Sequence, residues 1–108
     1  MPRTVQTLGT VLDAEIAALP KDMQAAFLRL VEPIEAVGPE QVGHPHVKHL
    51  RGKLWEMRFS GRDGIARAIY VTTVGQRTIL VHAFVKKSQT TPKAALDLAE
   101  RRAKKIEP

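Results

Sequence analysis

Residues Lys48–Lys87, KHLRGKLWEMRFSGRDGIARAIYVTTVGQRTILVHAFVKK, form the stretch that decides the fold. Three runs rich in β-branched and aromatic residues lie within it: Leu54–Phe59, Ile65–Val74 and Ile79–Val85. Glycines stand in the gaps between the runs, where tight turns need residues with few steric restrictions. The stretch therefore predicts three antiparallel strands in sequence order, a β-meander.

Charged and titratable residues interrupt these apolar runs. They are Glu56, Arg58, Arg67, His82 and Lys86. A strand that only fills a core rarely carries such side chains. We therefore expect one face of the sheet to meet a charged ligand.

Side chains alternate strictly along the first strand of the meander. One face carries its apolar residues, Trp55, Met57 and Phe59, which we expect to contact helices. The opposite face carries Glu56 and Arg58, which are able to form an ordinary ion pair. In a simple meander Arg67 and Lys86 lie beside them. Three cations around one carboxylate are more than pairing needs, and a bound phosphate would account for the surplus.

Charge is distributed unevenly along the chain. Residues 1–47 hold three basic and six acidic side chains, a balance of −3, whereas residues 48–108 hold fourteen basic and five acidic ones, a balance of +9. A basic segment of this kind favours a polyanion such as RNA or DNA, because each neutralised phosphate releases counterions. The alternative is that surplus positive charge only keeps a small protein soluble.

The length of 108 residues suits one domain, residues 1–108, with a single core. The chain has no cysteine, which excludes disulfides and thiolate chemistry and fits a reducing compartment. No apolar run is long enough to span a bilayer, and the first residues lack the apolar core of a secretory signal. We expect a cytoplasmic protein without a membrane segment.

The N-terminal part predicts helices. A short strand at Arg3–Leu8 precedes a helical pattern that begins at Val11 and continues up to Pro20, with Val11, Leu12, Ile16 and Leu19 on one apolar stripe. Apolar residues recur at helical spacing over Met23–Ile34, and Gly38 followed by a proline ends that helix. We expect these two helices to form a hairpin that covers one face of the sheet.

Residues Glu40–His49, EQVGHPHVKH, predict a loop because of their glycine and proline content. Three of the four histidines lie here: His44, His46 and His49. Their spacing matches no motif of known coordination geometry, and no carboxylate adjoins them. We expect solvated or phosphate-contacting histidines, with a metal site as the alternative.

A C-terminal helix is predicted to start with Thr91 as its N-cap and Pro92 at its first position, and to run to about Ile106. Its apolar stripe is narrow and consists mainly of small residues. Cations crowd its last turns: Arg101, Arg102, Lys104 and Lys105. They suit the negative end of the helix dipole, and they are equally suited to extending a surface that binds RNA.

Three segments together resemble a known family. KHLRGKLWEMR, then an arginine early in the next strand (Arg67), then HAFVKK leading into a helix that starts TTP, resemble the phage-derived, HigB-like branch of the RelE/ParE toxin superfamily. The resemblance covers roughly residues 10–106. It implies an α+β fold in which an N-terminal helical hairpin packs on a small, mainly antiparallel sheet of three to four strands, with a C-terminal helix.

The resemblance also implies an activity. It implies the toxin of a type II toxin–antitoxin pair, a ribosome-dependent mRNA endonuclease that inhibits translation and needs no metal or other cofactor. Its partners would be the ribosome, mRNA and a HigA-like helix-turn-helix antitoxin encoded beside it. The family's basic active-face positions correspond to Arg58, Arg67, Lys86 and Lys87.

In such enzymes the ribose 2′-OH attacks the adjacent phosphate, which requires a base, an acid and cations on the developing charge. Arg58 and Arg67 suit the phosphate, since a guanidinium group matches two of its oxygens. Proton transfer is open between Lys86, Glu56 and His82. The cations expected to bind RNA or the ribosome are Lys48, Arg51, Lys53, Arg62, Lys87 and Lys93.

Other functions fit the same fold, because a fold does not determine an activity. The alternatives are a non-catalytic nucleic-acid-binding module, a ParE-like toxin that targets gyrase, and an inactive phage-derived remnant.

Overall fold

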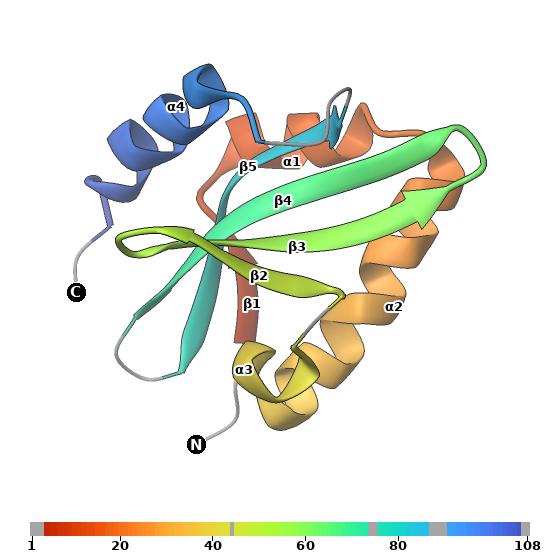
Figure 1. Ribbon diagram of the computed structural model, residues 1–108, viewed down its shortest axis with the longest axis horizontal. Helices are drawn as coiled ribbons and strands as arrows, with labels where there is room; N and C mark the ends of the chain where they lie inside the picture. Colours follow the sequence, from red (N-terminus) through yellow and green to blue (C-terminus); the bar gives the residue numbers. More distant parts are fainter. Residues whose placement is uncertain (1–3, 44, 74–75, 87–90, 107–108) are drawn as a thin grey trace.

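The computed structural model describes residues 4–43, 45–73, 76–86 and 91–106, without the side chain of residue 86. In chain order its elements are β1 (Thr4–Thr7), α1 (Thr10–Ala17), α2 (Lys21–Val37), α3 (Pro39–Val42), β2 (Val47–Arg51), β3 (Leu54–Gly61), β4 (Gly64–Thr73), β5 (Arg77–Lys86) and α4 (Lys93–Ala103). Figure 1 shows these elements along the chain.

The described strands form one sheet in the order β1-β5-β4-β3-β2. β1 runs parallel to β5, and every other neighbouring pair is antiparallel. The predicted β-meander is confirmed as β3, β4 and β5, and the predicted N-terminal strand is β1. The α+β class is confirmed, but the described residues form a sheet of five strands where three to four were expected.

Each face of the sheet has its own hydrophobic core. On one face α1 and α2 contribute buried side chains that include Leu12, Met23, Phe27 and Ile34, and the sheet contributes Met57, Phe59, Ala68 and Tyr70. The rings of Phe27 and Phe59 lie 5.5 Å apart. On the other face α4 contributes Ala95 and Ala99, against Leu54, Ile69, Val71 and Val81. The alternation predicted for the first strand of the meander thus directs Met57 and Phe59 towards α2 and Glu56 towards the side of α4.

The prediction of a loop over Glu40–His49 is wrong. α3 occupies its first residues and β2 its last, with β2 paired antiparallel to β3 at the edge of the sheet. Of the five residues of β2 only Val47 is buried, so this strand lacks the apolar alternation by which an inner strand is recognised.

The ends of the helices differ from the prediction in two places. Val11 was expected on the apolar stripe of the first helix, but it is 59% exposed, and Leu12 faces the core instead. α4 ends at Ala103, before the predicted Ile106, and its N-cap position is Pro92 without a capping side chain. Thr91 therefore is not the cap of α4, because its hydroxyl group is bound elsewhere.

The outer edge of β5 is only half covered by β1, which pairs with residues Arg77–Leu80. Beyond Leu80, side chains form hydrogen bonds with the backbone of β5. Glu15 of α1 accepts a hydrogen bond of 3.0 Å from the backbone N–H of Ala83, and Arg102 of α4 donates one of 2.9 Å to the carbonyl oxygen of Val81. These contacts satisfy backbone groups that an open edge would expose, and they join α1, β5 and α4.

Candidate nucleic-acid interface around Glu56

Glu56 and Arg58 point to the same face of β3 because they are two residues apart in a strand. The register with β4 places Arg58 opposite Arg67 and Glu56 opposite Ile69. Glu56 and Arg67 are therefore diagonal neighbours on the face that α4 partly covers. The sheet brings together the carboxylate and two of the cations that the sequence singled out.

These side chains form an ionic cluster together with Thr91. Arg67 donates a hydrogen bond of 3.0 Å to Oε2 of Glu56, and Nε of Arg58 donates one of 3.1 Å to Oε1. The hydroxyl group of Thr91, just before α4, donates to Oε2 over 2.9 Å and also accepts from Arg67. We call Glu56, Arg58, Arg67 and Thr91 the Glu56 cluster.

The members of the Glu56 cluster differ in their access to solvent. Glu56 is 0% exposed and Arg67 is 1% exposed, whereas the side chain of Arg58 is 28% exposed. Two guanidinium groups share one carboxylate, so the cluster carries a surplus positive charge. That surplus reaches solvent through Arg58, and direct contact between Arg67 and a phosphate would require the cluster to open.

Burial lowers the pKa of Arg67 below its ordinary value, the Glu56 carboxylate raises it, and the nearby Arg58 guanidinium lowers it again. Arginine stays protonated through such changes because its ordinary pKa is so high. Glu56 and Arg67 thus form a buried ion pair, and Glu56 orients Arg58 through the hydrogen bond from its Nε.

Lys86 and Lys87 lie at the limit of the described residues. The backbone of Lys86 pairs with Ile65, two residue pairs beyond the pair of Arg67 with Phe84, on the strand next to β4. The side chain of Lys86 and all of Lys87 lie outside the described residues, so their predicted roles stay predictions.

His82 is held apart from the Glu56 cluster. It pairs with Ile69, which in turn pairs with Glu56, so β4 separates the two side chains. The ring of His82 lies 3.0 Å from Glu15, 3.5 Å from Arg102 and stacks on Phe84. The structure therefore engages His82 in joining α1 and α4 to β5.

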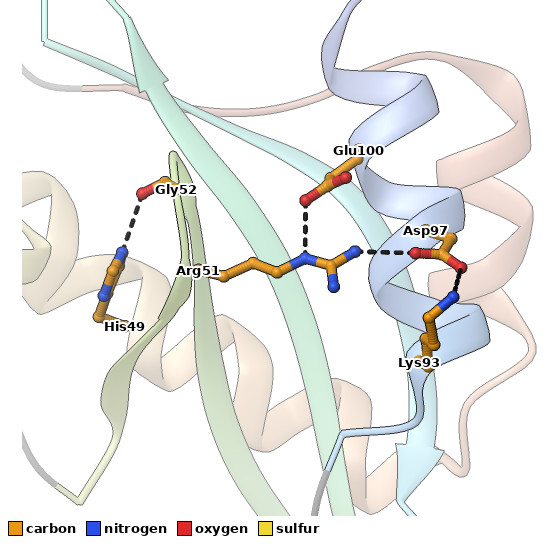
Figure 2. Close-up of polar contacts among 6 residues, drawn as sticks. All are labelled: His49, Arg51, Gly52, Lys93, Asp97 and Glu100. Atoms are coloured by element: carbon orange, nitrogen blue, oxygen red, sulfur yellow. Dashed lines mark hydrogen bonds and ion pairs between the residues drawn. The ribbon is translucent and has the colours of Figure 1, made fainter.

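The cations predicted to bind RNA fall into two groups. Lys48, Lys53 and Arg62 are exposed, and Lys48 stands opposite Glu56 in the register of β2 with β3. The guanidinium group of Arg51 instead contacts Asp97 and Glu100 of α4 over 2.8 Å and 2.7 Å, as Figure 2 shows.

Lys93 also contacts Asp97, over 3.2 Å (Figure 2). The charges of Arg51 and Lys93 are thus partly neutralised by α4, and Arg51 fixes α4 to the hairpin of β2 and β3. Hydrogen bonds from Arg51 and from Lys93 to Asp97 lower the pKa of that carboxyl group below its ordinary value. RNA contact by these two residues stays a prediction.

The described histidines form no metal-binding group. Nε2 of His49 lies 2.9 Å from the carbonyl oxygen of Gly52 (Figure 2), and the His49 ring contacts that of Trp55. His44 lies outside the described residues. Within the described part of the chain, no three His, Asp or Glu side chains gather as ligands of one ion.

Among the described residues, no helix combines the length and apolar character needed to cross a bilayer.

The family described as Phage derived protein Gp49-like (DUF891) matches residues 14–104, which include every member of the Glu56 cluster. The chain belongs to the Gp49-like family. This family is toxin-like and phage-derived, which is consistent with a role in a toxin–antitoxin pair. No curated protein matches the chain.

Sequence reasoning missed two features of this Gp49-like protein. It assigned Thr91 to the start of a helix, and it gave Glu15 and Arg102 no role with His82. The contacts of these residues join positions 35 residues apart, for Thr91 and Glu56, and 67 residues apart, for His82 and Glu15. No local pattern signals such contacts, and the unusual burial of charge in a strand was the only hint that a partner was needed.

Proposed function

We propose that this Gp49-like protein is a HigB-like toxin of a type II toxin–antitoxin pair and that it cleaves mRNA on the ribosome. The observation that supports this most is the Glu56 cluster, in which a buried carboxylate holds a partly exposed arginine on a basic sheet face. A structural ion pair needs one cation, and the second leaves positive charge for a phosphate.

In the proposed reaction the ribose 2′-OH loses its proton and its oxygen attacks the adjacent phosphorus. The bond from phosphorus to the 5′-oxygen then breaks, which leaves a 2′,3′-cyclic phosphate and a 5′-OH end. Arg58 stabilises the charge that develops on the non-bridging oxygens. Arg67 and Glu56 act as positioning residues, because both are buried and hold Arg58 in place.

Proton transfer is assigned to Lys86 in this proposal: its neutral amine takes the proton of the 2′-OH, and the resulting ammonium group gives that proton to the departing 5′-oxygen. Both oxygens of Glu56 already accept hydrogen bonds and the side chain has no exposure, so Glu56 is poorly suited to be the base. His82 is engaged with Glu15 on the far side of β4. Lys86 is kept as the proton-transfer residue for two reasons. Its backbone pairs with Ile65, two residues before Arg67 in β4, and the family resemblance places it among the basic active-face positions.

A HigA-like helix-turn-helix antitoxin is the proposed partner. It would block toxicity by covering Arg58, or by holding the toxin in an assembly too large for the ribosomal A site. Co-expression of the adjacent gene should restore growth and yield a complex that survives gel filtration. A neighbouring gene product that neither binds nor protects would contradict this partner.

The decisive experiment is induction of the protein alone in a bacterial host, with transcript ends and DNA breaks mapped in the same cells. Growth should stop, and new 5′-OH ends should appear inside translated reading frames. Arg58→Ala should remove these ends. Lys21→Ala deletes an exposed cation of α2, outside the residues expected to bind RNA, and should retain them.

The other outcomes contradict the proposal in different ways. Double-strand DNA breaks without transcript cuts would assign the toxin to gyrase. Cuts outside reading frames would remove the requirement for the ribosome. Normal growth with soluble, folded protein would argue against a toxin.

A further inference from the structure

A groove of about 350 Å³ lies between α2 and the end of β3, on the α2 side of the sheet, and Arg58 is the one member of the Glu56 cluster that lines it. α2 lines it with Ala26, Arg29, Leu30 and Pro33, and β3 lines it with Arg58, Phe59 and Ser60. Val42 and His46 complete its wall. Its size is at the lower end of the range for small-ligand sites. Arg58 therefore borders two features, the cluster on the sheet face and this groove.

The chemistry of the groove is apolar inside and cationic at its mouth. Leu30 and Phe59 are buried, while the side chains of Arg29 and His46 are exposed and Arg58 is partly exposed. Flat guanidinium and imidazole groups are the surfaces on which unstacked nucleobases pack. A cation beside an apolar slot suits a nucleotide, which joins a flat base to a phosphate.

The backbone of β3 adds a pair of polar groups to the groove. The register of β2 with β3 ends at Met57, and the N–H of Arg58 donates to the carbonyl oxygen of His46 over 2.8 Å. In a strand, alternate residues direct their N–H and C=O to the same side, so Ser60 directs its pair to the edge that β2 has left. One donor and one acceptor at strand spacing match the edge of a nucleobase.

A peptide strand is a weaker fit to the same groove. Strand addition depends on a run of backbone hydrogen bonds along an edge. Here the open edge contains Ser60 alone before the turn at Gly61, so it offers one residue's pair. The cationic mouth also favours an anion over a neutral peptide.

We propose that this groove receives one base of single-stranded RNA, next to the phosphate held by Arg58. The inference rests on the proposed function, because it places a neighbouring nucleotide of the RNA that is cut. It extends the site from the face of the sheet, around Arg58, onto α2.

The test compares two probes of equal charge, the octanucleotide rA8 and an octamer of abasic ribose phosphates, by fluorescence anisotropy with the full chain. The wild-type protein should bind rA8 at least about fivefold more tightly, since stacking of one base contributes on this scale. Ala26→Leu fills the groove without a change of charge, and it should remove this preference and leave binding of the abasic probe unchanged. Ala25→Leu, on the exposed face of the same helix, should change neither.

A second pair of variants avoids reliance on packing. Arg29→Glu and Lys21→Glu reverse one exposed cation each on α2, but only Arg29 lines the groove. Arg29→Glu should weaken rA8 binding more than Lys21→Glu does. In the wild-type protein rA8, but not the abasic probe, should shift the amide signal of Ser60 in NMR spectra.

The outcomes separate this inference from the proposed function. If Ala26→Leu and Arg29→Glu bind rA8 as their controls do, the groove is not a base site, even where cells show RNA cleavage. If the base preference depends on the groove but no transcript is cut, RNA cleavage fails and the groove assignment stands. Loss of antitoxin binding by Ala26→Leu with unchanged RNA binding would assign the groove to a protein segment and overturn the inference.

Discussion

The hydroxyl group of Thr91 donates a hydrogen bond of 2.9 Å to Oε2 of Glu56 and accepts one from Arg67. This contact ties the start of α4 to the middle of β3. Arg51, at the end of β2, holds the same helix through Asp97 and Glu100. The position of α4 therefore depends on polar contacts with two strands of the sheet, β3 through Glu56 and β2 through Arg51.

The Thr91 hydroxyl should contribute measurably to stability. Thr91→Val keeps the shape of the side chain but leaves Oε2 of Glu56 with one donor fewer in a buried site. We expect the free energy of unfolding to fall by about 1–3 kcal/mol in urea titrations. Thr91→Ser retains the hydroxyl group and should lose much less. Equal stability of the valine and wild-type proteins would show that this hydrogen bond contributes nothing.

Substitution of Glu56 should lower the stability of the fold, whatever its effect on RNA cleavage. Glu56→Gln removes the carboxylate charge beside the buried Arg67, and loss of one partner of a buried ion pair costs about 3–5 kcal/mol in comparable sites. Thermal unfolding should show a large fall in the midpoint. Glu32→Gln, an exposed carboxylate of α2, should stay within about 0.5 kcal/mol of the wild-type protein. A stable Glu56→Gln protein would mean that the cluster does not need the charge of Glu56, which would undermine its role in positioning Arg58.

Binding of RNA should depend on salt through Arg58 more than through Arg51. For single strands the slope of log affinity against log salt changes by roughly 0.7 for each phosphate that the protein no longer neutralises. Arg58→Ala should reduce the slope by about this amount, because the exposed part of Arg58 is free to meet a phosphate. Arg51→Ala should leave it nearly unchanged, since Asp97 and Glu100 already hold that charge. The reverse order would move the interface towards the hairpin of β2 and β3.

Stability should decrease at acidic pH through Glu15. Burial opposes ionisation of this carboxyl group, but hydrogen bonds from the Ala83 N–H, His82 and Arg102 outweigh it and hold its pKa below the ordinary value of 4.5. A lowered pKa in the folded state stabilises the protein above the unfolded pKa, and this contribution is lost as pH falls through the folded pKa. The free energy of unfolding, measured from pH 7 down to pH 3, should therefore fall less steeply for Glu15→Gln. Parallel curves would contradict this assignment.

The turn between β3 and β4 should be less stable with a side chain at position 61 while Asp22 is present. A Cβ atom on Gly61 would lie 2.6 Å from Oδ2 of Asp22, which accepts a hydrogen bond from the Arg62 N–H. Gly61→Ala must displace that carboxylate, and we expect a loss of about 1 kcal/mol. In the Asp22→Ala background the same change should have little effect, because the clash is gone. Additive effects in this double-mutant cycle would show that the two residues do not interact.

Much of the fold followed from the sequence alone. The three runs of the meander, the N-terminal strand and the helical repeat of Met23–Ile34 were predicted from local patterns, and the alternation in LWEMRF put Glu56 and Arg58 on one face. These features are set within a few residues, since a strand repeats every two residues and a helix every 3.6. β2 escaped prediction because an edge strand buries little and shows no such pattern.

Only the tertiary structure decided which partners each charge has. It paired Glu56 with Thr91 as well as with both arginines, engaged His82 with Glu15, and bound Arg51 to α4. The sequence displays these groups but not their distances, because the contacts of Glu56 with Thr91, of His82 with Glu15 and of Arg51 with α4 join residues between 35 and 67 positions apart. They form only when the helices pack on the sheet, where burial makes an unpaired charge so unfavourable that each buried group must find a partner.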